Sequence, residues 1–477
     1  ECAYYSESFF GMHVKEKRLT SGDPLPGGIR EMLVIALPMM ISHACDTIMT
    51  FTDRMFLSRL GPEMMNAAMS GGMTSLMMMT FFMGLIGYST ALVAQYLGAN
   101  RKHTSPVVTA QVFLVILVAY PVILLLKPLA SRFFVIMHIP DEQLAPQMIY
   151  FNIMIFGTII GLLRTALSSY FSGIGKTRIV MIAAILSMIV NVGVNYVLIF
   201  GKFGVAPMGI RGAAIGTIIG GVSGLLVLIA AYLGRTNRRE FNVMQSFRYY
   251  PQIMKKLLNY GYPAGLEFMF NFFAFNLMIL IFHSAGSVTA TATTIMFNWD
   301  MVSYVPLIGI EVAVTSLVGR YMGAGDTALA TKSALSGLKT GAFYSVFILI
   351  LFVFFTEELV LIFRPATGSG IFDQAFPTAV FMLRVASIYV LVEAAIAAFV
   401  GALRGAGDTR WSMVASVILH YSMLLVSILV FKVFHLSAEI AWIIVVFLFM
   451  LFSVVFYLRF RSGKWKKIRI VEENPET

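Results

Sequence analysis

An apolar stretch near the start of the chain carries polar side chains at helical spacing. These side chains belong to His43, Asp46, Thr50 and Asp53. Their separations of 3, 4 and 3 residues place them on one face of a helix. A carboxylate at the centre of a membrane helix costs about 2.5–3.5 kcal/mol, and it is tolerated where it faces a cavity, a partner or an ion. We therefore expect Asp53, with Asp46 as a secondary candidate, to bind a cation or exchange a proton. The simpler alternative is a pairing of Asp53 with Arg54 or Arg59.

Other acidic residues stand among apolar neighbours in the second half of the chain. Glu393, in YVLVEAAIAAF, would be desolvated there, which disfavours the charged form and suits proton exchange. Arg384 is a secondary candidate, but it lies nine residues earlier and out of phase on the same helix. A structural salt bridge to Glu393 is the alternative. Glu311, in IGIEVAV, has only apolar sequence neighbours, so we expect it to be functional before Asp300, a secondary candidate in FNWDMV.

The elements that carry these residues are membrane helices. The chain has 477 residues, of which 58% are hydrophobic and only 12% charged, about half the charged share of soluble domains. Runs of about 20 apolar residues recur along nearly the whole length, and they are continuous rather than alternating, which excludes a β-barrel pattern. We predict an all-α polytopic membrane protein with twelve transmembrane helices. The predicted spans are 30–58, 66–97, 106–127, 146–171, 178–200, 212–233, 256–284, 288–321, 333–355, 376–402, 411–432 and 437–459.

Basic residues orient these spans. With the N-terminus inside, about 25 of the 35 Lys and Arg residues fall on the inner side and about 8 on the outer side. We expect both termini to be cytoplasmic and the membrane to be the cell's inner (plasma) membrane. The net charge of +11 then reflects topology and not a nucleic-acid partner. The polar start predicts no cleaved signal peptide, with Met12 as a candidate natural start, and Cys2 and Cys45 give no disulfide framework.

The chain also repeats itself. LVAQYLGA at 92–99 returns as LVGRYMGA at 317–324, 225 residues later, and SGIGKTR at 172–178 returns as RGAGDTR at 404–410, 232 residues later. Pro38 and Pro263, Gly61 and Gly286, and Gly84 and Gly309 keep the first offset. Each half has six spans in one orientation, so we predict two lobes related by a pseudo-two-fold axis along the membrane normal. The predicted segments are an N-terminal segment (1–29), an N-lobe (30–233), a cytoplasmic linker (234–254), a C-lobe (255–460) and a C-terminal tail (461–477).

These motifs resemble those of the MATE family, the multidrug and toxic compound extrusion transporters. The matching pieces are IALP, FTDRMFLSRLG, LVAQYLGA, SGIGKTR, NVGVNYVLIFGKFGVAPMGIRGAAIGT, LVGRYMGAGD and GALRGAGDTR. Together they cover residues 30–430. The resemblance implies twelve helices in two lobes, export of drug-like organic cations, and energy from inward flow of Na⁺ or H⁺ with no other cofactor.

The resemblance also assigns candidate site residues in the first half. Asp53 matches the acidic residue of the family's first span. The resemblance places Asn191 and Asn195 beside this acid, with Thr217 nearby. Such oxygen ligands would suit Na⁺, so Asp53, Asn191 and Asn195 are a possible sodium site. Some family members have a second acid where Asn195 stands, which leaves the ion open. Interhelical hydrogen bonding is the alternative role for the two asparagines.

In the second half, Glu393 matches an acidic position of the family's bacterial branch. The family's usual acid in the seventh span falls here on Asn271, whereas Glu267 lies one turn earlier on the same face. The carboxylate has either moved by one turn or lost its role. Both residues are therefore candidates for binding the coupling ion or the cargo.

The balance of charge inside the spans favours cationic cargo. Six acids (Asp46, Asp53, Glu267, Asp300, Glu311 and Glu393) stand against Arg54, Arg164 and Arg384. We predict a cation-coupled antiporter that exports cationic and amphipathic organic compounds by alternating access, with small organic cations and the lipid bilayer as partners, acting as a monomer. A flippase of lipid-linked oligosaccharides is the alternative, and it would need a basic midplane groove. The sequence shows no triad, metal-ligand cluster or nucleotide fingerprint, so we expect no enzyme. The Met- and Phe-rich stretches SLMMMTFFMG and EFMFNFFAFN are candidates to line an adaptable pocket.

Overall fold

The computed structural model describes residues 25–136, 141–364 and 370–471, and within these ranges the chain is helical, with no β-strand. Cys2 and Met12 lie outside the described residues. The α-helices are α1 (Ile29–Ser58), α2 (Pro62–Gly87), α3 (Ser89–Gly98), α4 (Ser105–Ile136), α5 (Asp141–Gly173), α6 (Thr177–Phe200), α7 (Ile210–Tyr232), α8 (Arg235–Phe241), α9 (Pro251–His283), α10 (Ser287–Gly323), α11 (Thr327–Phe354), α12 (Thr356–Leu361), α13 (Gly370–Ala406), α14 (Thr409–Ile428) and α15 (Ala438–Arg461). Short 3₁₀ turns lie at Lys102–Thr104, Val243–Gln245 and Lys464–Lys467, and Leu429–Val433 forms a π-helical turn after α14.

Twelve helical segments of the described chain are long and apolar enough to cross a membrane, which confirms the predicted number of spans. One span combines α2 and α3, which are separated at Tyr88, while α8 and α12 are too short to cross. Large apolar side chains face outward along these helices, among them Leu117, Leu125 and Phe343. Soluble proteins rarely expose so much apolar surface to water, so this surface faces lipid. The protein is therefore a multi-pass membrane protein.

The repeated sequence motifs produce repeated backbone turns. Gly61 precedes α2 with φ 141°, and Gly286 precedes α10 with φ 122°. Gly175, before α6, has φ 76°, and Gly407, before α14, has φ 92°. Side-chain-bearing residues rarely adopt such positive φ values, so glycine is needed at these turns. The two halves of the chain therefore begin equivalent helices in the same way.

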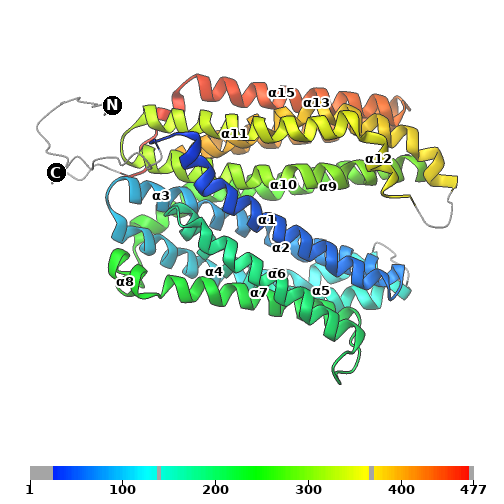
Figure 1. Cartoon of the computed structure of the whole chain (residues 1–477), viewed down its shortest axis with the longest axis horizontal. Helices are drawn as coiled ribbons and strands as arrows, with labels where there is room; N and C mark the ends of the chain where they lie inside the picture. The colour runs from blue at the N-terminus through cyan, green and yellow to red at the C-terminus, as the bar shows by residue number, and fades with distance from the viewer. Residues whose placement is uncertain (1–24, 137–140, 365–369, 472–477) are drawn as a thin grey trace, which may run out of the picture.

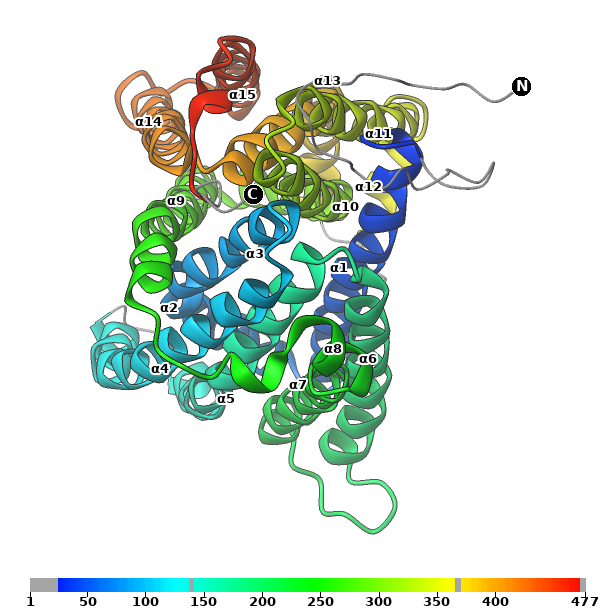
Figure 2. The same ribbon diagram turned by 90° about the vertical axis from the view of Figure 1, so that its left-hand side faces the viewer.

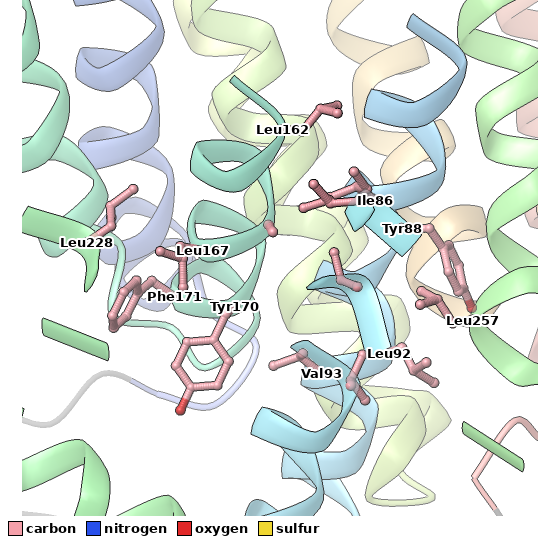
Figure 3. Packing of buried hydrophobic residues seen from close by; sticks show 14 of the residues in the cluster. Ile86, Tyr88, Leu92, Val93, Leu162, Leu167, Tyr170, Phe171, Leu228 and Leu257 are labelled. Carbon is pink, nitrogen blue, oxygen red and sulfur yellow. The ribbon is translucent and has the colours of Figure 1, made fainter. Parts of the chain in front are cut away.

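The helices fall into two groups. Figure 1 shows α9 to α15 on one side of the molecule and α2 to α8 on the other, with α1 crossing between them. The view in Figure 2 looks onto the end where α1 begins, where α15 ends and where α8 lies. In the group of α2 to α8, side chains of α2, α3 and α5 share one apolar cluster with α7, and Leu257 of α9 joins it from the other group (Figure 3). We refer to α1 to α8 as the N-lobe, to α9 to α15 as the C-lobe, and to the end shown in Figure 2 as the terminal end.

The lobes touch closely at the terminal end. Gly98 and Gly323 hold equivalent positions in the repeat, at the ends of α3 and α10. A Cβ on Gly98 would lie 1.8 Å from the carbonyl oxygen of Arg320, and a Cβ on Gly323 would lie 2.0 Å from that of Gln95. The contact is thus reciprocal, because Gln95 and Arg320 are also equivalent. The Gln95 side chain donates a hydrogen bond to the Gly405 carbonyl of the C-lobe at 2.8 Å.

The segment after α15 crosses this contact. Trp465 is fully buried, and its indole N–H donates to the Phe460 carbonyl at 2.8 Å. Further along, Ile470 is buried within the N-lobe cluster that contains Tyr88 and also lies against Gly407 of the C-lobe. The chain after the last span therefore links both lobes at the terminal end.

Candidate functional site

Asp53 lies in a buried polar cluster between three N-lobe helices. Its side chain projects from α1 toward α6 and α7. The Asn195 amide donates to Asp53 Oδ1, and the Thr217 hydroxyl donates to Oδ2 at 2.9 Å. Asn191 donates to the Thr217 hydroxyl oxygen at 3.4 Å. The structure thus brings together all four predicted N-lobe residues, around a carboxylate that is only 7% exposed.

The two asparagines leave hydrogen-bond acceptors unused. Asn191 and Asn195 are both 0% exposed, and the Oδ1 atom of each has no hydrogen-bond partner among the described residues. Buried polar atoms are normally satisfied, so each orphan needs an explanation. Two amide oxygens beside a carboxylate give a set of acceptors that a small cation would satisfy. A flip of either side chain would exchange the positions of its amide oxygen and nitrogen, so the oxygen can also be turned toward an ion beside Asp53.

Glycines on α7 make room for these amides. A Cβ on Gly216 would lie 1.8 Å from Asn195 Oδ1, and a Cβ on Gly220 would lie 2.7 Å from the Asn191 Cβ. The polar face of α6 therefore packs directly on a glycine face of α7. Gly216 and Gly220 were not among the predicted site residues, although they are four residues apart, as Asn191 and Asn195 are.

Asp53 forms no salt bridge with the described residues, and the charge of the adjacent Arg54 acts on it only at longer range. Within the described chain, the salt bridges join other pairs, so the alternative pairing of Asp53 with Arg54 or Arg59 is wrong for this structure. Asp46, the secondary candidate on the same helix, is instead paired with Arg164 of α5, with 3.3 Å between Oδ1 and Nη2. Asp46 and Asp53 therefore differ, because of these two only Asp46 forms a salt bridge.

A second polar cluster lies in the C-lobe around Arg404. Its guanidinium forms a short ion pair with Glu311 of α10 and lies 3.7 Å from the Glu267 carboxylate of α9. Although the sequence neighbours of Glu311 are apolar, its carboxylate is paired in space, because Arg404 reaches it from α13. The predicted tenth span ends at residue 402 and so leaves Arg404 in the inner loop. In the structure α13 continues to Ala406.

Asn271 lies one turn beyond Glu267 on α9. Its amide donates to the Ser416 hydroxyl of α14 at 2.7 Å, while its Oδ1 atom has no partner in the described part of the protein. The carboxylate of Glu267 is 4% exposed. The structure thus places both candidates of the seventh span on the same side of α9, facing α13 and α14.

Glu393 and Asp300 form a third acidic group, in which Glu393 is buried and Asp300 partly buried. Glu393 of α13 is 3% exposed, and its Oε2 atom has no hydrogen-bond partner within the described ranges. Asp300 of α10 accepts a hydrogen bond from Tyr389, one turn before Glu393. Arg384 pairs with the exposed Glu357 at 2.9 Å and not with Glu393. The salt bridge offered as an alternative for Glu393 is therefore absent from the described chain.

The Met- and Phe-rich stretches lie where the lobes meet. They belong to α2 and α9, which pack against each other. A Cβ on Gly84 would lie 3.0 Å from the Cβ of Phe268, and just before the second stretch a Cβ on Gly265 would lie 2.6 Å from the Phe81 carbonyl oxygen. At the level of these residues the two stretches are in direct contact.

Two lobes of six membrane-spanning helices, with buried carboxylates in each lobe, define a secondary-transporter class of protein. The sequence model of the MatE family matches residues 38–197 and 263–430, so it covers both lobes. The chain therefore belongs to the MatE family and is a MATE transporter, as its motifs predicted.

Named relatives align with nearly the whole chain. A protein of Thermotoga maritima named "Probable multidrug resistance protein NorM" is 28% identical over 452 residues, covering 92% of this chain and 93% of that protein. "Multidrug resistance protein NorM" of Vibrio cholerae is 26% identical over 382 residues, covering 79% of this chain and 81% of that protein.

Solved structures share the fold. A MOP superfamily transporter from Pyrococcus furiosus, described as having a binding pocket of reverse polarity, superposes with a TM-score of 0.83 at 19% identity, covering 92% of this chain and 97% of that chain. An outward-facing MATE family transporter superposes with a TM-score of 0.82 at 19% identity, covering 94% and 100%. At this identity the likeness supports the fold alone.

Proposed function

We propose that this transporter is an antiporter that exports cationic and amphipathic organic compounds in exchange for inward flow of Na⁺ or H⁺. One observation carries the proposal. Asp53 is buried and forms no salt bridge with the described residues, and next to it two buried amide oxygens have no hydrogen-bond partner there. A carboxylate kept in this state is stabilised when a cation binds and destabilised when it leaves. The names of the relatives, which are multidrug resistance proteins, support the cargo class.

Topology follows from the same proposal. The terminal end would face the cytoplasm of an inner membrane, because the basic α8 segment and both ends of the described chain lie there (Figure 1). The closed terminal end would then leave the opposite side as the route of release. Each chain carries both lobes, so a monomer would complete the transport cycle. No cofactor beyond the coupling ion is proposed.

The flippase alternative is less well supported. It would need unpaired basic residues at mid-depth to hold phosphate groups. Arg164, Arg320 and Arg404 are each paired with a carboxylate.

Replacing Asp53 by Asn tests the proposal. We expect ethidium efflux from loaded proteoliposomes to fall at least about tenfold, which corresponds to about 1.4 kcal/mol of lost coupling. Asp373→Asn, which changes an exposed acid paired with Arg364, is the matched control and should keep efflux. Undiminished efflux by the Asp53→Asn protein would refute the proposal.

Separate gradients identify the ion. The unused amide oxygens favour Na⁺, so we expect a Na⁺ gradient alone to drive ethidium efflux in proteoliposomes. Efflux driven only by a pH gradient would assign the role to protons instead.

A further inference from the structure

Arg404 holds two carboxylates of the C-lobe at once. It lies on α13, while Glu267 and Glu311 come from α9 and α10, so one guanidinium joins three helices. A guanidinium has five N–H donors in a planar fork and stays charged, which lets it serve two carboxylates together. The two contacts are unequal. Glu311 is held closely, whereas the nearest atoms of Arg404 and Glu267 are 3.7 Å apart.

The fold itself does not require this trio. At the repeat offsets, the corresponding residues of the N-lobe are Ser42, Ile86 and Ser172, none of which is charged. The N-lobe packs its equivalent helices without an ion pair at this point, and Ser172 instead accepts a hydrogen bond through its carbonyl from Ser316 at 2.7 Å. The three charges are therefore a property of the C-lobe alone.

The surroundings of the trio are rich in acceptors and poor in cations. Two carboxylates and one guanidinium leave an excess of one negative charge. Unpartnered acceptor atoms lie on the same helices, Oδ1 of Asn271 on α9 and Oε2 of Glu393 on α13. The Arg404 side chain is 27% exposed, so it is not sealed off from its surroundings. A cation that enters the C-lobe would compete with Arg404 for these oxygens.

We propose that Arg404 is a resident counter-cation that sets the charge selectivity of the C-lobe. Because it compensates Glu311 and partly compensates Glu267, the trio offers one free negative charge and favours cargo with a single positive charge over cargo with two. Glu267, which lies at the longer distance from Arg404, is the carboxylate that binds the cationic cargo in place of Arg404. The inference rests on the proposed export of organic cations.

The test compares a monocation with a dication. Purified full-length protein in proteoliposomes would export ethidium, with one charge, and methyl viologen, with two, and the ratio of the two initial rates is the readout. Arg404→Gln should raise the methyl viologen to ethidium ratio about tenfold, because two carboxylates lose their compensating charge. Arg404→Lys keeps the charge and should leave the ratio within about twofold of the wild type.

A charge-compensated variant separates selectivity from folding. Arg404→Gln combined with Glu311→Gln removes one charge of each sign and should return the ratio close to that of the wild type. An unchanged ratio in the Arg404→Gln protein, with ethidium efflux retained, would overturn the inference and leave the trio as a link between helices.

Glu267→Gln covers the case in which Arg404→Gln does not fold. It removes the excess carboxylate and should lower the ratio, and an unchanged ratio would again overturn the inference. Should the wild-type protein export neither dye, the proposed function fails, and the inference fails with it. If all variants export ethidium and the methyl viologen to ethidium ratio is the same in each, the inference is refuted while the proposed function stands.

Discussion

At the residue scale, the buried cluster around Asp53 has more hydrogen-bond acceptors than donors to satisfy them. Thr217 and Asn195 each supply a donor, but the Oδ1 atoms of Asn191 and Asn195 are left over. An unsatisfied buried polar atom costs about 1–3 kcal/mol. A bound cation would remove that cost at several atoms together, which is a reason to place the coupling ion here and not at Asp46, whose charge Arg164 already compensates.

The glycine beside Asn195 offers a test at this scale. Gly216→Ala would put a methyl group 1.8 Å from the present position of Asn195 Oδ1, so the amide must move. We expect the Na⁺ concentration for half-maximal efflux to rise about tenfold while maximal efflux is retained, because a ligand is displaced and the carboxylate remains. Gly193→Ala on α6 is the control, since its Cβ would meet nothing within 4 Å. Equal effects of the two substitutions would contradict the assignment.

Sequence spacing predicted part of this chemistry. Asp53, Asn191 and Asn195 could be found because four-residue spacing on one helix and a charge in an apolar run are local signals. Arg404 could not be found in this way, because Glu311 lies 93 residues away along the chain and the two meet only when α10 packs on α13. Apolar neighbours in sequence say little about neighbours in space.

At the element scale, α10 and α13 approach each other through glycine. A Cβ on Gly401 would lie 2.7 Å from the Glu311 carbonyl oxygen, and a Cβ on Gly405 would lie 2.7 Å from that of Thr315. Small residues four apart let membrane helices approach until backbones touch. This close approach is what brings the Arg404 side chain to Glu311.

Gly401→Val tests the importance of that approach. We expect a loss of about 1–3 kcal/mol of stability from overpacking, seen as a lower midpoint of thermal unfolding in detergent micelles. Gly87→Val is the control, because a Cβ at Gly87 would have open space. Similar midpoints for the two variants would show that the α10–α13 contact adapts more easily than its geometry implies.

Hydropathy predicted the number of helices well and their ends less well. The tenth predicted span, 376–402, became α13 at Gly370–Ala406, because helical hydrogen bonding continues beyond the apolar core of a span. The helix stops before Gly407, whose positive φ turns the chain. Polar residues at the end of a membrane helix are therefore easily misread as loop.

At the scale of the whole molecule, the lobes meet at the terminal end. Gly98 and Gly323, the Gln95 side chain and the chain after α15 all contribute there. The internal repeat predicted two lobes, but it could not predict how they touch, because the contact is made between the lobes and depends on neither of them alone. The present structure has the terminal end closed.

Gly98→Leu should open this end. Its side chain would collide with the Arg320 carbonyl, so the closed state is disfavoured. Ser316 is fully buried at the lobe contact, which makes Ser316→Cys a reporter in a protein whose Cys2 and Cys45 are replaced by Ala. We expect a water-soluble maleimide to label it at least about tenfold faster when Gly98 is Leu, since side-chain access then follows the open population. Unchanged labelling would contradict this, and Gly193→Leu serves as the control.

The paired glycines at the lobe contact also bear on energy conservation. Where main chain meets main chain, no side chain can rotate to leave the seam half open. The seam is then either sealed or parted along both α3 and α10 together. In the proposed ion-driven cycle, a water path from one side of the protein to the other would dissipate the gradient, and an all-or-none seam would keep such leakage low.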